Sequence, residues 1–137
     1  MTPDRVQQIV ETHYPWMYRA LRLAPWDIAL DYWSLPVGRG ECETDSAHRT
    51  AAIILDPDEH DTADEVLMTL LHELLHVRFA VLDVYHEAVS PLLTPREQEA
   101  VDSLYMLATE QIVGETLRLL REGLGLSFST MRKAAQK

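Results

Sequence analysis

The feature that most constrains the fold is a long apolar segment, residues 62–79, with the pattern of a buried helix. Thr62 and Glu65 form a Thr-x-x-Glu capping box at its start. The apolar residues that follow cover most of a helix circumference: Val66, Leu67, Leu70, Leu71, Leu74, Leu75, Val77 and Phe79. A helix that is apolar on all sides must be surrounded by other parts of the protein. We expect it to run to about Tyr85–Val89, before the Ser-Pro pair that begins at Ser90.

The chain before this helix predicts one helix and a small sheet. Helical spacing predicts a helix from Asp4 to about Leu23, which Pro15 kinks or breaks. Alternation of apolar and polar residues predicts a strand at Trp26–Leu35. A weaker strand is expected at Glu41–Asp45 and a short apolar one at Thr50–Leu55. Together they predict an antiparallel or mixed sheet of about three strands.

The chain after the apolar helix predicts one more long helix. Thr94, Pro95 and Glu97 form a second capped start, and the helix should end near Gly123. The residues after Leu126, 127–137, are expected to be a short frayed tail. We therefore expect one α+β domain, residues 1–137, in which an N-terminal helix and a sheet precede two long antiparallel helices.

Composition excludes several classes of function. The net charge of −10 argues against the phosphate-neutralising surface of a general nucleic-acid binder. No segment has the length of a bilayer span, and the N-terminus lacks the apolar core of a signal peptide. Cys42 is the only cysteine, so no intramolecular disulfide can form. We expect a cytoplasmic protein with no nucleic-acid or membrane partner.

Three polar residues inside the apolar helix have the spacing of a catalytic metal site. The segment His72-Glu73-Leu74-Leu75-His76 places two imidazoles on one helix face, about one turn apart. Both can reach one Zn²⁺ ion, and Glu73 beside them could accept a proton from metal-bound water and pass it to a leaving amine. Zn²⁺ would lower the pKa of that water and polarise a substrate carbonyl. Without a metal, burial of these three polar groups would be costly.

Geometry excludes two candidates for the third protein ligand that catalytic zinc needs. On a continuous helix, His86 lies about 15 Å beyond His76 along the axis and is turned by roughly 80°. Asp83 lies about 10 Å up the same helix. No glycine between His76 and Pro91 folds the chain back toward the metal, which disfavours the longer three-histidine motif of metzincins.

Glu110, on the last predicted helix, is the third ligand that we expect. Its distance from His76 suits a helix, a turn around Pro91–Pro95 and an antiparallel return helix. Gly114 lies on the same face, and a glycine inside a helix costs about 1 kcal/mol relative to alanine. We attribute it to close approach of the two helices. Glu115 is the alternative ligand, although it faces about 140° away from Glu110.

The pattern His72-Glu73-x-x-His76 followed by a glutamate on the next helix resembles the gluzincin branch of zinc metallopeptidases. The order of elements is similar to minimal zincin domains, such as ImmA/IrrE-type peptidases and small phage or prophage metallopeptidases with a Glu-Gln-x-Val segment. SprT-type domains share this plan but use a third histidine. The resemblance covers roughly residues 50–120. It implies a minimal zincin fold and a protein or peptide substrate.

The chain departs from the better-known gluzincins at one position. Their Glu-x-x-x-Asp pattern would place an aspartate at Gly114 to orient a ligand histidine, so this partner must come from elsewhere or from a backbone carbonyl. The group that stabilises the oxyanion stays open among Tyr85, His60 and His48, each of which is more often a surface or structural residue. We assign the remaining conspicuous residues to the core or to packing: Tyr105, Trp16, Trp26 and Trp33, with His13 structural or exposed.

Zinc-dependent hydrolysis of peptide bonds is thus the expected function. In similar zincins an edge strand aligns the substrate by strand addition, and Thr50–Leu55 or its neighbour could do so. A first alternative is a zinc-binding structural or interaction module without peptidase activity, which the small size favours but which does not need Glu73 as a base. A second alternative is a metal-free structural protein, and elemental analysis distinguishes it from the others.

Overall fold

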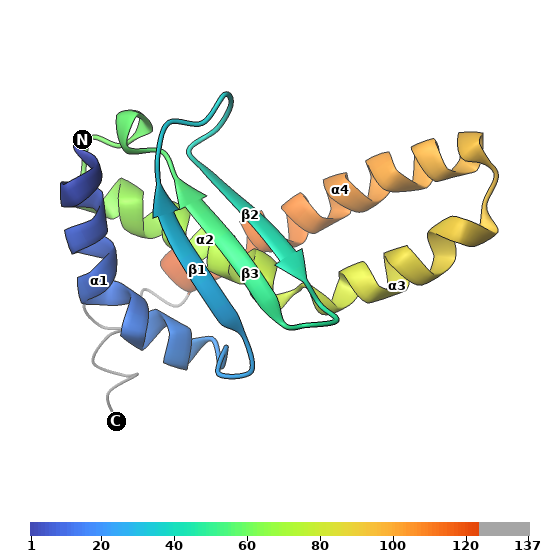
Figure 1. The fold of residues 1–137 in the computed structure, drawn as a ribbon, viewed down its shortest axis with the longest axis horizontal. Coiled ribbons are helices and arrows are strands. Elements are labelled where there is room, and N and C mark those ends of the chain that lie inside the picture. The colour runs from blue at the N-terminus through green and yellow to red at the C-terminus, as the bar shows by residue number, and fades with distance from the viewer. Residues whose placement is uncertain (124–137) are drawn as a thin grey trace.

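The structure, a computed structural model, describes residues 1–123 and has α+β architecture, as expected (Figure 1). The expected tail, 127–137, lies outside the described residues. The elements, in chain order, are α1 (Pro3–Ala20), β1 (Asp27–Tyr32), β2 (Gly40–Asp45), β3 (Thr50–Leu55), α2 (Ala63–Arg78), α3 (Val81–Val89) and α4 (Pro95–Arg118). Short 3-10 helices at Pro57–Glu59 and Ser90–Leu92 precede α2 and α4, and a π-helical turn at Leu119–Gly123 follows α4.

Helix α1 is continuous through Pro15, so of the kink or break expected there, the break is wrong. The hydroxyl of Thr2 caps its start by accepting from the backbone N–H of Arg5. Pro15 removes one helical hydrogen bond. The two residues that follow, Trp16 and Met17, are buried at 3% and 0% exposure. Their packing holds the last turn of the helix in place.

The three strands form a mixed sheet in the order β1-β3-β2. β3 is the central strand, parallel to β1 and antiparallel to β2. All three expected strands are present, although the first is shorter than Trp26–Leu35 because it ends at Tyr32. The sheet therefore has two edges, and β2 is one of them.

The core lies between one face of the sheet and the helices α1 and α2 (Figure 1). β3 contributes alternate residues to this face, namely Ala51, Ile53 and Leu55. The helices contribute a larger set, including Val6, Val10, Met17, Val66, Leu70 and Leu74. Burial of each such side chain stabilises the fold by about 1.5–3 kcal/mol. The all-round burial predicted for the apolar helix is therefore confirmed.

Helix α2 begins at the predicted capping box of Thr62 and Glu65 but ends at Arg78. The expectation of one helix running to Tyr85–Val89 is wrong, because the chain leaves helical geometry at Phe79 and resumes as α3. The hydroxyl of Ser46 donates to the carbonyl oxygen of Ala80 at 3.1 Å. This contact from the β2–β3 turn holds the bend, which no glycine or proline marks.

Helices α3 and α4 form an antiparallel arm that extends away from the sheet (Figure 1). The Thr94–Glu97 capping box is present, as predicted. Among the described residues of α4, Val113 alone is buried.

Tyr105 does not lie in the core, contrary to expectation. It is half-buried, its ring stacks on His86 with centroids 4.2 Å apart, and its hydroxyl donates to the Asp83 carboxylate.

The assignments of the other aromatic residues are confirmed except at one position. Trp16 is buried, and its indole N–H donates to Nδ1 of His13 at 3.2 Å, a structural role for that histidine. Trp26 packs against the core from the side. Trp33 is 48% exposed and therefore not a core residue, because it follows the end of β1. Among the described residues, no helix combines the length and apolarity of a membrane span.

Candidate metal centre

The structure brings His72, His76 and Glu110 together, although Glu110 lies on a different helix. The Nε2 atoms of the two histidines are 3.2 Å apart. One carboxylate oxygen of Glu110 lies 2.9 Å from Nε2 of His76, and the other lies 3.3 Å from Nε2 of His72. Helix α2 supplies the two imidazoles from adjacent turns, and α4 crosses beside them with its carboxylate.

The separation of the two Nε2 atoms, 3.2 Å, is close to that between two donor atoms of one tetrahedral cation. Ligand bonds of about 2.0–2.1 Å to zinc place donor atoms roughly 3.3 Å apart along the edges of a tetrahedron. One donor atom from each of the three side chains lies within 4.8 Å of the other two. Among the described residues, no other group of three or more His, Cys, Asp or Glu side chains comes this close together. Two imidazoles and one carboxylate are a donor set that zinc accepts while keeping a fourth position free.

The two histidines of the cluster are partly buried. Their side chains are 29% and 18% exposed, whereas that of Glu110 is 57% exposed. Burial lowers the pKa of His76, although the nearby Glu110 carboxylate acts in the opposite direction. A lower pKa favours the neutral ring, which is the form that binds a metal ion.

Glu73 lies behind this cluster as a buried carboxyl group. It is 6% exposed, and no described residue hydrogen-bonds it. Burial raises its pKa to about 8, and Coulomb repulsion from Glu110 and Glu41 adds to the shift. A carboxyl group that titrates near neutral pH can both accept and donate a proton, as a general acid–base group must.

Gly40, at the start of β2, lies directly against Glu73. A Cβ at this position would lie 2.9 Å from Oε1 of Glu73 and 2.7 Å from the methyl carbon of Thr69. The absence of a side chain therefore allows the sheet edge to approach α2 at the candidate base. No local sequence pattern predicts this contact, because it joins two segments that are far apart in sequence.

A pocket of about 310 Å³ opens beside the cluster. Its lining includes both His72 and Glu73, and the other lining residues are Arg39, Gly40, Met68, Thr69 and Leu117. The pocket thus lies between the start of β2, the middle of α2 and the end of α4. The candidate base and one candidate ligand thus face the same cavity.

The other residues considered for the site lie elsewhere. The carboxylate of Glu115, the alternative ligand, accepts from the Gln111 side chain at 3.2 Å and is not in the cluster. The Asp83 carboxylate accepts from Thr44 at 2.9 Å and from Tyr105, while His86 pairs with Asp102 at 2.6 Å. Asp83 and His86 therefore do not belong to the cluster. The distances expected for them assumed one continuous helix, and this assumption is wrong because the chain bends at Phe79.

None of the three oxyanion candidates lines the pocket beside the candidate metal centre. Tyr85 is 68% exposed on α3, and His48 pairs with Asp45 in the β2–β3 turn. His60 is fully buried. Its Nδ1 donates to the carbonyl of Asp56 at 2.6 Å, and its Nε2 accepts from the Thr69 hydroxyl at 2.8 Å. His60 is therefore a structural residue, since both ring nitrogens are occupied.

Gly114 does not allow a close approach of helices, so that expectation is wrong. A Cβ at this position would meet no atom within 4 Å, and the residue is exposed. No described residue hydrogen-bonds Nδ1 of His72 or His76, so the structure supplies neither the aspartate nor the backbone carbonyl expected as an orienting partner.

Comparison with protein-family models, with curated proteins and with solved structures finds no significant match to this chain. The chemistry of the site therefore rests on its own geometry.

Proposed function

We propose that this protein is a zinc-dependent peptidase of the minimal zincin type, similar to gluzincins, with His72, His76 and Glu110 as metal ligands. The observation that carries the proposal is the close approach of these three side chains. The two Nε2 atoms lie 3.2 Å apart, and each lies within 3.3 Å of a carboxylate oxygen of Glu110, Oε1 for His76 and Oε2 for His72. Donor atoms this close together can share one zinc ion. The minimal zincin fold and the hydrolysis of peptide bonds are what the resemblance to gluzincins implies.

Glu73 is the general acid–base residue of this proposal. A bound zinc ion would supply a water of lowered pKa and would polarise the substrate carbonyl. Glu73 accepts a proton at its carboxylate and returns it to the departing amine. Its burial next to His72 on α2 places this carboxyl group beside the candidate ligands, where both proton transfers would take place.

The free edge of β2 is the proposed site for the substrate main chain. β3 cannot serve, because β1 and β2 occupy both of its edges. β2 pairs with β3 on one side, and Gly40 at its start lies against Glu73. A peptide that adds to this edge as a further strand would pass the pocket at the metal centre.

The experiment combines metal analysis with a cleavage assay. Purified wild type should contain about one zinc ion per chain and should cleave an unfolded protein or a peptide library. Glu73→Gln should keep the zinc and lose cleavage, because the amide cannot take up the proton. A chelator should abolish activity, and added zinc should restore it.

The same assay decides between the alternatives. Zinc binding with no cleavage by wild type on any library would favour a non-catalytic zinc module. Protein that stays empty when offered zinc would favour the metal-free structural protein. Equal cleavage by wild type and Glu73→Gln would show that the proposed mechanism is wrong.

A further inference from the structure

An apolar groove lies between α3 and α4, along the arm that these two helices form. Its volume is about 440 Å³, and it shares no lining residue with the pocket beside the candidate metal centre. Among the described residues that line it, none is Asp, Glu, Lys or Arg, although 25% of the chain is charged. Its apolar and aromatic lining comes from both helices and includes Leu82, Tyr85 and Val89 of α3 and Leu104, Ala108 and Ile112 of α4. We call it the arm groove.

The arm groove follows from the helical period of the two segments. Leu82, Tyr85 and Val89 are spaced by three and four residues. Leu104, Ala108 and Ile112 are spaced by four. Residues at these spacings lie on one face of a helix. Each helix therefore carries one apolar stripe, and the two stripes lie side by side because both line the same groove.

The arm has little packing of its own to hold α3 in place. The nine residues of α3 all lie in the described part of the chain, and none of them is buried. α3 and α4 make few contacts with each other. His86 joins them, because its ring stacks on Tyr105 and its Nε2 lies 2.6 Å from the Asp102 carboxylate. Helices this short are marginal in water unless an apolar face is packed. A further apolar surface over the groove would therefore stabilise the arm.

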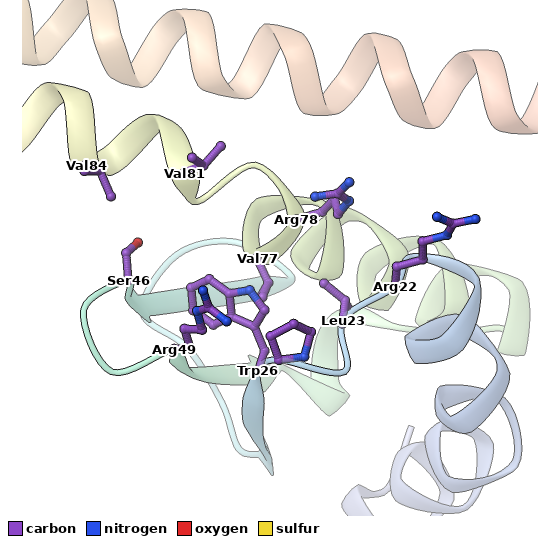
Figure 2. A pocket seen from close by; sticks show the side chains of 10 residues that line it. Arg22, Leu23, Trp26, Ser46, Arg49, Val77, Arg78, Val81 and Val84 are labelled. Carbon is purple, nitrogen blue, oxygen red and sulfur yellow. The ribbon is translucent and has the colours of Figure 1, made fainter.

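The other side of α3 faces the rest of the domain. Figure 2 shows the pocket where the end of α1, the β2–β3 turn and the end of α2 meet. Val84 of α3 lines this pocket together with Trp26, and its side chain points away from α4. The side of α3 that carries Tyr85 and Val89 is thus the one that stays open to solvent, at the arm groove.

The exposed apolar area of the arm groove is close to what one partner of a dimer buries. Four of its lining residues, Tyr85, Val89, Leu104 and Ile112, are between 39% and 68% exposed. Taking about 150–250 Å² for a fully exposed residue of this size, the four leave on the order of 400 Å² in water. A standard-size interface buries about 800 Å² per partner, of which about 60% is apolar. The four residues therefore supply most of that apolar part, and the partly buried lining residues add to it.

We propose that the arm groove binds the same groove of a second copy of this protein, so that the two arms form a four-helix bundle. A bundle surrounds one apolar core with four helices, and each arm supplies an antiparallel pair. A two-fold axis places the same patch on both sides of an interface, so one groove per chain is sufficient. The absence of charged lining residues avoids like charges opposite each other in two chains that each carry a net charge of −10.

This dimer leaves the candidate metal centre accessible. Ile112 lines the arm groove, whereas Glu110 is turned from it by about 160° around α4. Glu110 lies instead with His72 and His76 of α2. The groove and the candidate metal centre therefore use different faces of α4. The inference does not rest on the proposed peptidase activity.

The test is the oligomeric state of the full-length protein, measured by sedimentation velocity from about 1 to 100 μM. Wild type should form a dimer in this range, and no larger species. Leu104→Glu should weaken dimerisation by about 100-fold or more, because it places a carboxylate in an apolar interface. Met106→Glu is the matched control and should dimerise as wild type. Met106 is as exposed as Leu104 on the same helix but does not line the groove.

Three further measurements separate dimerisation from folding and from metal binding. Val89→Glu, on the other wall of the groove, should also give a monomer. Fluorescence of the tryptophans, of which Trp16 is buried, shows whether the core of each variant is folded. The melting temperature of wild type should rise with protein concentration, because a dimer gains stability by mass action. His72→Ala should dimerise as wild type, so that a failure of the proposed peptidase function leaves this test unaffected.

Four results would each overturn the proposal. The first is a wild type that stays monomeric at about 100 μM, whatever else then covers the groove. The second is a series of larger assemblies that grow with concentration, since a two-fold interface closes at two copies. The third is a dimer that persists in both Leu104→Glu and Val89→Glu. The fourth is an equal loss of the dimer in Met106→Glu.

Discussion

Gly40 of β2 and Glu73 of α2 are in such close contact that a Cβ at position 40 would lie 2.9 Å from the Glu73 carboxylate oxygen and 3.1 Å from its Cγ. One edge of the sheet is thereby held against the candidate base. Glu73 in turn lies one residue after His72 on α2, so the position of the sheet edge fixes the carboxylate relative to the candidate ligands.

Substitution Gly40→Ala should therefore reduce the proposed peptidase activity without removing the proposed zinc ion. The added methyl group must displace both Glu73 and Thr69, and a shift of about 1 Å in a catalytic group can lower the rate by about 100-fold. We expect kcat/KM to fall by about 10- to 100-fold while zinc content stays at the wild-type level. Kinetics and elemental analysis on the same preparation measure both. Activity close to wild type would show that this contact does not position the base.

Gly114→Ala is the matched glycine substitution, because its Cβ meets no atom within 4 Å. Alanine has the higher helix propensity, so α4 should gain stability. We expect the free energy of unfolding to rise by about 0.5–1 kcal/mol and activity to stay unchanged. Urea denaturation followed by circular dichroism measures the first quantity. A loss of stability at this position would mean that the two helices approach more closely than the structure describes.

Much of the fold could be predicted because its signals are local in sequence. Thr62 and Thr94 begin their helices as predicted, since a capping box depends only on residues three apart. His72 and His76 share a helix face because of the helical period alone. Glu110 could be selected from the length of chain needed for an antiparallel return helix.

The features that could not be predicted depend on contacts between distant segments. α2 ends before Phe79 although neither glycine nor proline is present, because Ser46 and Thr44 of the β2–β3 hairpin hold Ala80 and Asp83. The continuity of α1 through Pro15 likewise depends on burial of the residues after it. Local propensity is a weak prior when tertiary packing acts against it.

Substitution Glu110→Gln should weaken zinc binding, and Glu115→Gln should not. Glu110 lies 2.9 and 3.3 Å from the two imidazoles, whereas Glu115 is bonded to Gln111. Loss of a charged ligand should lower zinc affinity by about 100-fold or more. Competition with a fluorescent zinc chelator measures the affinity of each variant. If Glu115→Gln were the weaker binder, the assignment of the third ligand would be reversed.

Substitution Tyr105→Phe should destabilise the α3–α4 arm. It removes the hydroxyl that donates to the Asp83 carboxylate, which also accepts from Thr44 of β2. Hydrogen bonds to charged groups contribute about 1.5–3 kcal/mol, so we expect the free energy of unfolding to fall by about that amount. Tyr85→Phe is the control, since this side chain is exposed on the same arm. Equal unfolding midpoints for the two variants would contradict a stabilising role for the Asp83–Tyr105 contact.

Cys42 should be nearly unreactive toward iodoacetamide in the folded protein. Burial raises the pKa of its thiol to about 12, and repulsion from Glu73, Asp83 and Glu43 adds to the shift. The thiolate is the reactive form, and a free cysteine has a pKa near 8.5. At pH 8 the thiolate fraction of Cys42 is therefore about 10⁻⁴, compared with roughly a quarter for a free cysteine.

The pH profile of labelling distinguishes this cause from simple shielding. Because the pKa lies far above the working range, the labelling rate should rise about tenfold for each pH unit between 7 and 10 without a plateau. The urea-unfolded chain provides the reference, and its rate should level off above about pH 9. Mass spectrometry of timed samples gives both rates. A plateau near pH 8.5 in the folded protein would show that the environment of Cys42 does not disfavour its thiolate.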